Sequence, residues 1–110
     1  MPYINVSTSA KIEDKRKLLE EISILISSLT NKSKRFVMAK LDDNCEMYFN
    51  DYSPSCFLEI KSIGSLHPSD MAKPISDFIH EKMGIPIDKI YISFEDVSAS
   101  MWAWNGSTFG

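Results

Sequence analysis

The sequence predicts an α+β domain in which two βαβ repeats form a four-stranded mixed sheet with two helices on one face. Three observations support this fold class: two segments with apolar residues at helical spacing, strand-like segments on both sides of each, and a constant offset between the halves. From Tyr3 to Phe57, and from Phe36 to Ile90, the offset is 54 residues. Because βαβ crossovers are right-handed, both helices are expected on the same face.

The first repeat is expected to contain a strand, a helix and a strand, over residues 3–8, about 12–29 and 36–41. Apolar and β-branched residues partly alternate in the first of these strands. The helix is supported by one apolar stripe at steps of three and four: Leu18, Leu19, Ile22, Leu25, Ile26 and Leu29. The mixed charges over 11–17 are expected to form a solvated face of this helix.

The second repeat is expected to have the same order, with its elements over residues 56–63, about 69–83 and 89–97. A second helical stripe consists of Met71, Ile75, Phe78, Ile79 and Met83. Gly84 is a plausible C-cap, and Pro86 follows beyond it. Pro74 is expected to kink this helix or to delay its first turn.

The sheet face away from the helices needs a cover. In segments 56–63 and 91–94, the residues on that side include polar as well as apolar groups. Such a face can pack against other subunits around a wetter centre, which predicts an oligomer. The tail, 101–109, holds both tryptophans around an Asn-Gly turn signal. It is expected to form an interface or a ligand contact, and the alternative is a tail folded onto its own core.

Length and charge exclude several classes of protein. The chain of 110 residues is expected to be one domain, 1–110, with a modest core. A net charge of -3 without a basic block argues against binding to nucleic acid. The apolar runs are far shorter than the roughly 20 residues that span a bilayer, and no signal-peptide pattern is present. We therefore expect a cytoplasmic protein that does not insert into a membrane.

No metal or cofactor is expected. The acidic segment 42–44 lacks the spacing of a calcium-binding loop and is expected to be a solvated loop. Cys45 and Cys56 do not form a CxxC pair, and neither is at a standard ligand spacing from His67 or His80. Two reduced thiols are the better interpretation.

Pro2 is the strongest candidate for chemistry. It follows the initiator methionine, which is readily removed before a small second residue, and removal would leave a free secondary amine. An α-amine has an unperturbed pKa of about 7.7 to 8.0, and an apolar environment near a cation disfavours its charged form. Proline is common in this position, so the motif alone is weak evidence. The strand that follows would hold the amine in a sheet.

Several motifs together carry a specific resemblance. They are Pro2 at the start, Lys32 after the first helix, Ser62-Ile63-Gly64, the segment Ile87-Asp88-Lys89-Ile90-Tyr91-Ile92, and the ending Trp104-Asn105-Gly106-Ser107-Thr108-Phe109. In these residues the chain resembles the macrophage migration inhibitory factor family of tautomerases over essentially its whole length. The Ser-Ile-Gly motif and the Trp-Asn-x-Ser-Thr-Phe ending make the combination specific.

The resemblance implies a homotrimer with active sites at the subunit interfaces and an α-keto acid substrate such as phenylpyruvate. Pro2 would be the base that moves a proton between carbon and oxygen. Lys32 and the backbone near Ile63 would bind the carboxylate, and Tyr91 would come from the neighbouring subunit. The remaining residues that would line the pocket are Tyr3, Ser93, Trp102, Trp104 and Phe109.

Departures from the family pattern limit what the resemblance implies. Vertebrate members carry a CxxC linked to thiol oxidoreductase activity, whereas this chain reads Cys-Phe-Leu-Glu over 56–59, so that activity is expected to be absent. Ser93 stands where they have asparagine and Trp102 where they have valine, which predicts a changed, more aromatic pocket. A signalling, cytokine-like role with incidental tautomerase activity stays open, as does release from the cell by a non-classical route.

Overall fold

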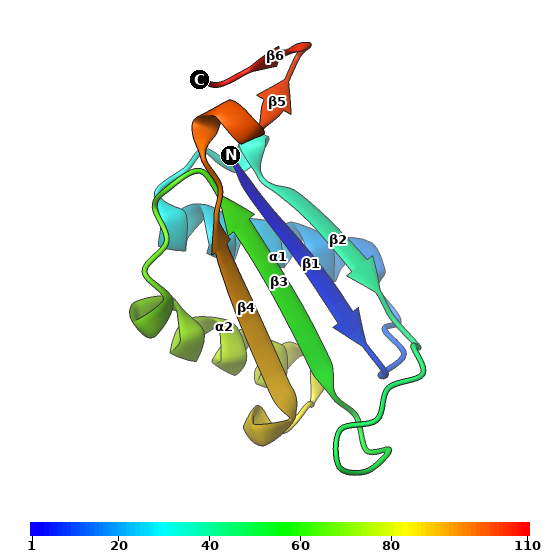
Figure 1. Cartoon of the computed structure of the whole chain (residues 1–110). Coiled ribbons are helices and arrows are strands. Elements are labelled where there is room, and N and C mark those ends of the chain that lie inside the picture. Colours follow the sequence, from blue (N-terminus) through cyan, green and yellow to red (C-terminus); the bar gives the residue numbers. More distant parts are fainter.

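Two helices cover one face of a four-stranded sheet in the computed structural model, which describes residues 1–110 (Figure 1). The strands are β1 (Pro2–Thr8), β2 (Met38–Asp42), β3 (Cys56–Ser62) and β4 (Ile90–Asp96), in the order β2-β1-β3-β4. The sheet is mixed, since β1 pairs with β2 and β3 with β4 in parallel, whereas β1 and β3 are antiparallel. Helices α1 (Lys15–Thr30) and α2 (Pro68–Met83) connect the parallel pairs. The predicted fold class is confirmed.

The two repeats are related by a pseudo-twofold axis that passes between β1 and β3. Asn5 and Glu59 are 54 residues apart, which is the repeat offset, and they are also partners in the antiparallel register. The Asn5 Nδ2 donates a hydrogen bond to Glu59 Oε2 at 3.3 Å. Every position at one end of the β1–β3 pair therefore has a counterpart at the other end.

The core lies between the sheet and the helices because alternate strand residues point toward the helices. Its fully buried residues come from β1, β3, α1 and α2 and include Ile4, Val6, Ile22, Ile26, Leu58, Ile60, Met71, Ile75 and Ile79. Both predicted helical stripes therefore supply core residues.

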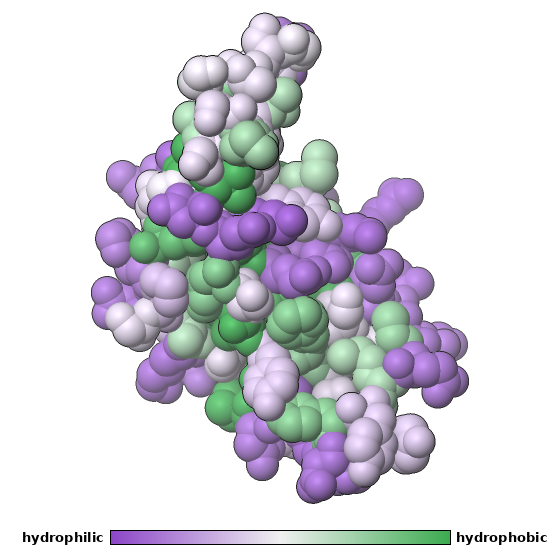
Figure 2. Space-filling view, in the orientation of Figure 1, coloured by the Kyte–Doolittle hydropathy of each residue, from purple (hydrophilic) through white to green (hydrophobic).

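The opposite face of the sheet is not covered within one chain. It carries an ion pair of 3.4 Å between Lys61 and Glu95, together with exposed aromatic residues such as Tyr91. Figure 2 views the molecule from this side and shows hydrophilic and hydrophobic groups next to one another. The sequence-based prediction that this face carries polar as well as apolar groups is confirmed.

Helix α1 begins three residues later than predicted. The side chain of Asp14 caps it by accepting a hydrogen bond from the Lys17 amide at 3.1 Å. Just before this cap, the Ile12 amide donates to Asp43 Oδ2 at 2.9 Å, and Lys15 pairs with Asp43 at 3.2 Å. The segment before residue 15 is thus outside the helix. The prediction that Asp43 is solvated was wrong, since its side chain is 12% exposed.

Helix α2 begins at Pro68 and continues through Pro74, so the predicted delay of its first turn was wrong. A proline at the first helical position costs little because that amide has no intrahelical partner. The predicted C-cap at Gly84 is confirmed, since this residue has a φ of +69° and its amide donates to the His80 carbonyl at 2.9 Å.

Short turns connect the remaining elements. Phe36, predicted to open the second strand, is instead the last residue of a 3-10 turn, η1 (Lys34–Phe36). Another such turn, η2 (Ile87–Lys89), precedes β4. After β4 the chain forms η3 (Ala99–Met101) and the hairpin of β5 (Ala103–Trp104) and β6 (Ser107–Thr108). None of the helices has the length and apolar character needed to cross a membrane.

The tail hairpin confirms the predicted Asn-Gly turn. Asn105 and Gly106 have φ values of +53° and +83°, which are the left-handed conformations that a tight two-residue hairpin turn needs. The hairpin lies at the same end of the molecule as the start of β1 (Figure 1). The tail therefore meets the end of the sheet at which Pro2 lies.

Candidate active site

Pro2 is buried at the start of β1, directly opposite Ser62 of β3. Met1 is present in this structure, so the Pro2 nitrogen is an amide and the Met1 amine stands in for the chain terminus. Burial, and secondly the positive charge of Lys32, lower the pKa of the Met1 amine below its ordinary value. The environment at this end of the sheet thus favours the uncharged form of an amine.

Lys32 is held in place by the C-terminal end of α1. Asn31 ends the helix in the left-handed conformation with a φ of +55°. The Ser27 hydroxyl donates to the Lys32 carbonyl at 2.6 Å, and the Lys32 ammonium donates to the Ile63 carbonyl at 3.4 Å. Its cation therefore lies between the end of α1 and the end of β3, on the side where the chain begins.

The Ser62-Ile63-Gly64 turn is tied to the end of β4. The Val97 amide donates to the Ser62 carbonyl at 2.8 Å, and the Gly64 amide donates to Asp96 Oδ1 at 2.9 Å. Gly64 has a φ of +68°, a backbone conformation in which glycine avoids steric cost. Asp96 thus positions the backbone around Ile63.

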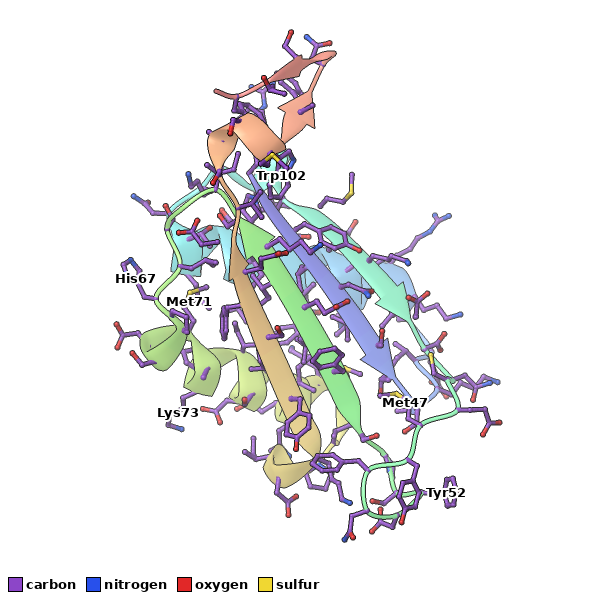
Figure 3. The ribbon with its side chains drawn as sticks, in the orientation of Figure 1. Met47, Tyr52, His67, Met71, Lys73 and Trp102 are labelled. Atoms are coloured by element: carbon purple, nitrogen blue, oxygen red, sulfur yellow. The ribbon has the colours of Figure 1, made fainter.

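Two neighbouring hollows, of about 310 and 400 Å³, open at this end and share Met1 and Phe36. The first is lined by Met1, Pro2, Tyr3, Arg35, Phe36, Val37, Met38, Trp102, Ala103 and Trp104. The second is lined by Met1, Lys32, Ser33, Phe36, Ile63, Ala99 and Phe109. Figure 3 shows Trp102 where the tail meets the start of β1. Seven of the predicted site residues line these hollows.

The aromatic residues of the two hollows come from separate parts of the chain. Trp104 meets the edge of Phe36 with ring centroids 5.9 Å apart, and the Arg35 guanidinium lies 5.0 Å from the Phe36 centroid. The Phe109 amide donates to the Trp102 carbonyl at 3.0 Å. The tail hairpin and η1 therefore form one aromatic wall.

Tyr91 and Ser93 do not join this site within one chain. In the sheet register, Tyr91 is level with Ser7 of β1. Ser7 lies five residues from Pro2, which corresponds to roughly 17 Å along a strand. Tyr91 is 60% exposed as a residue, and its ring packs on that of Phe49 with the ring centroids 4.6 Å apart. The assignment of Tyr91 and Ser93 to the pocket depends on a neighbouring subunit and stays a prediction.

The sequence reasoning did not identify Phe36, Arg35 or Asp96 as site residues. Phe36 was expected in a strand. Its position four residues after Lys32 and next to Arg35 could have indicated that it belongs to the site. Asp96 has no local signal, since its partner Gly64 is distant in the sequence. No group of three or more His, Cys, Asp or Glu side chains is arranged to hold a metal ion.

Comparison with known proteins identifies the family. The family model described as macrophage migration inhibitory factor (MIF) matches residues 1–110. The crystal structure of a MIF homologue from Prochlorococcus marinus is similar with a TM-score of 0.93 and 39% identity, covering 98% of this chain and 99% of that one. The structure of MIF from Trichinella spiralis is similar with a TM-score of 0.91 and 27% sequence identity, and the match covers 97% of this chain and 99% of that one.

A curated relative supports the same assignment. The MIF homologue of Wuchereria bancrofti is 30% identical over 118 residues, which cover all of both chains. The match thus extends over both repeats and over the tail that forms the aromatic wall. The chain therefore belongs to the macrophage migration inhibitory factor family, within the tautomerase superfamily.

Proposed function

We propose that this protein is a keto-enol tautomerase of phenylpyruvate-like α-keto acids, with Pro2 as the base after Met1 has been removed. The observation that carries the proposal is the position of the buried start of β1, which lies beside Lys32 and an aromatic wall. The two causes that lower the pKa of the Met1 amine, burial and the Lys32 cation, would act on a Pro2 amine as well. A lowered pKa increases the fraction of such an amine that is a free base near neutral pH.

The proposed reaction moves one proton and needs no cofactor. The Pro2 nitrogen takes a proton from the carbon next to the keto group, and the electron pair of that C–H bond forms the enolate. The resulting prolinium then returns the proton to the enolate oxygen. The Lys32 ammonium pairs with the substrate carboxylate and offsets the negative charge that develops on the enolate. The wall formed by Phe36 and Trp104 accommodates the aromatic ring.

The proposal includes a homotrimer whose subunits complete one another's sites. Tyr91 and Ser93 lie on the uncovered face of the sheet, far from Pro2 of the same chain. A neighbouring subunit that packs against this face can bring them to a second chain's hollow. Sedimentation equilibrium tests this directly, since a mass that corresponds to one chain at all concentrations would contradict it.

The decisive experiment compares two forms of the protein, one with Met1 removed and one that retains it, each verified by intact mass. Only the processed form should convert phenylpyruvate, because acylation removes the basic lone pair of Pro2. Pro2→Ala keeps a terminal amine without the ring that directs it, so activity should fall while the circular dichroism spectrum is unchanged. Full activity in the form that retains Met1 would exclude Pro2 as the base.

A signalling role is the second candidate, supported by the names of animal relatives such as the macrophage migration inhibitory factor of Xenopus tropicalis, 28% identical over 96 residues. In that case the amine and its hollows would be inherited, and a surface of the protein would act on a partner. A cell assay with Pro2→Ala separates the two candidates. A response that persists in this variant favours signalling, and a response lost with catalysis favours the enzyme.

A further inference from the structure

Each of the two hollows beside the chain start contains one cationic side chain. Lys32 is the only charged side chain that lines the hollow of about 400 Å³. Arg35 is the only one that lines the hollow of about 310 Å³, which also contains Pro2. The two hollows share the wall formed by Phe36. The proposed function uses the cation of Lys32, whereas Arg35 has no role in it.

The guanidinium of Arg35 has no carboxylate partner within the chain. Every ion pair of the structure is formed by a lysine. The guanidinium instead lies over the ring of Phe36, 5.0 Å from its centroid, where the electrons of the ring attract a cation. Its planar fork of donors matches the two oxygens of a carboxylate. Arg35 is therefore free to bind an anionic group of a ligand.

The turn η1 determines which of two neighbouring cations lies at the hollow. Two hydrogen bonds hold the turn, from the Phe36 amide to the Ser33 carbonyl at 3.0 Å and from the Val37 amide to the Lys34 carbonyl at 3.1 Å. In this conformation Arg35 lines the hollow, whereas Lys34 lines neither hollow. Lys34 therefore serves as a control for a general effect of positive charge in this turn.

The rest of this hollow is mainly apolar and aromatic. Its walls include Trp102 and Trp104, and Figure 3 shows Trp102 near the start of β1. Trp104 meets the edge of Phe36 with ring centroids 5.9 Å apart. Such walls suit an aromatic ring, and a single charged group among them selects for one complementary group on that ring.

We propose that Arg35 binds a second anionic group of the substrate, which makes the protein selective for aromatic α-keto acids with a carboxylate on the ring. This inference rests on the proposed function, in which Lys32 pairs with the carboxylate of the α-keto acid. The substrate would extend over both hollows, with its ring on the wall formed by Phe36 and Trp104. The ring carboxylate takes no part in the proton transfer at Pro2, so Arg35 determines specificity and not the reaction.

A comparison of phenylpyruvate with 4-carboxyphenylpyruvate in the processed protein tests the inference, because the two compounds differ only in the ring carboxylate. The measured quantity is the ratio of kcat/KM for 4-carboxyphenylpyruvate to that for phenylpyruvate. Arg35 is exposed, so we expect Arg35→Gln to lower this ratio roughly three- to tenfold, as for an ion pair with favourable geometry near the surface. Lys34→Gln should leave the ratio unchanged. General damage to the fold lowers kcat/KM for both compounds and cancels in the ratio.

Salt and a conservative variant separate an electrostatic role of Arg35 from a structural one. A salt concentration of about 0.5 M screens exposed charges. It should therefore lower the ratio in the wild type more than in Arg35→Gln. Arg35→Lys keeps the positive charge without the planar fork and should give a ratio between those of the wild type and Arg35→Gln. A structural role would make the ratio independent of salt.

Calorimetry with cinnamate and 4-carboxycinnamate, which cannot tautomerise, measures binding without turnover. A loss in Arg35→Gln that is confined to the carboxylated compound, in binding or in kcat/KM, supports the inference. Equal ratios and equal binding of 4-carboxycinnamate in the wild type and Arg35→Gln overturn it, and turnover of phenylpyruvate then leaves the proposed function intact. A processed wild type that binds 4-carboxycinnamate through Arg35 but turns over neither keto acid overturns the proposed function alone. Absence of both binding and turnover in the wild type overturns both.

Discussion

Replacing Lys32 with methionine should impair catalysis strongly and stability little. The only hydrogen bond of its ammonium within the chain is the one to the Ile63 carbonyl, at 3.4 Å. This bond is long and contributes below about 1 kcal/mol to the free energy of unfolding. A hydrogen bond to a charged carboxylate contributes about 1.5–3 kcal/mol. Each 1.36 kcal/mol lost from the stabilisation of the transition state lowers the rate about tenfold, so loss of this hydrogen bond should lower kcat/KM roughly 10- to 150-fold.

The pH profile adds a second measurement. The positive charge of Lys32 lowers the pKa of the terminal amine, so its removal should raise that pKa. The acid limb of kcat/KM for the processed enzyme should therefore move to higher pH in Lys32→Met. Lys34→Met is the control, since Lys34 lies two residues later, at the start of η1, and lines neither hollow. Equal losses in the two variants, or an unmoved acid limb, would refute the assignment of Lys32.

Three further predictions concern residues outside the site. Burial raises the pKa of the Cys56 thiol to about 12, so a thiol reagent at pH 8 should label Cys45 in the native protein and Cys56 only after unfolding. Hydrogen bonds, of which those from Ser53 have the largest effect, lower the pKa of Asp51 to about 2. In the unfolded chain this carboxyl group has a pKa of about 4. The stabilisation that the carboxylate provides should therefore be complete above about pH 4 and be lost as the pH falls toward 2. An NMR titration should show this, with a higher pKa in Ser53→Ala. Gly84→Ala should cost about 1–2 kcal/mol in chemical denaturation because of the left-handed backbone, and no loss would contradict this reasoning.

The sequence predicts an element well where its signal is local. The two apolar stripes place both helices, and the Asn-Gly pair places the tail hairpin, because spacing and turn chemistry act within a few residues. The start of α1 was misplaced because the Ile12 amide is bound by Asp43, which lies 31 residues away along the chain. Periodicity contains no information about such a contact.

The candidate site could be predicted only in part, and mainly from the family resemblance. Pro2, Lys32 and Ile63 meet because α1 and β3 end beside the start of β1, which the repeat order makes expected. The role of Asp96 depends on a loop geometry that no spacing predicts.

The two chain ends lie at the same end of the molecule, which makes circular permutation a way to separate fold from chemistry (Figure 1). A short linker from Gly110 to Pro2, with new ends opened in the loop between β2 and β3, would preserve the paired strands and both helices. The Pro2 nitrogen would then be an internal amide without basicity, whatever processing enzymes the host provides. Such a permutant would be a folded protein without the proposed base, and any activity that it retained would belong to its surface.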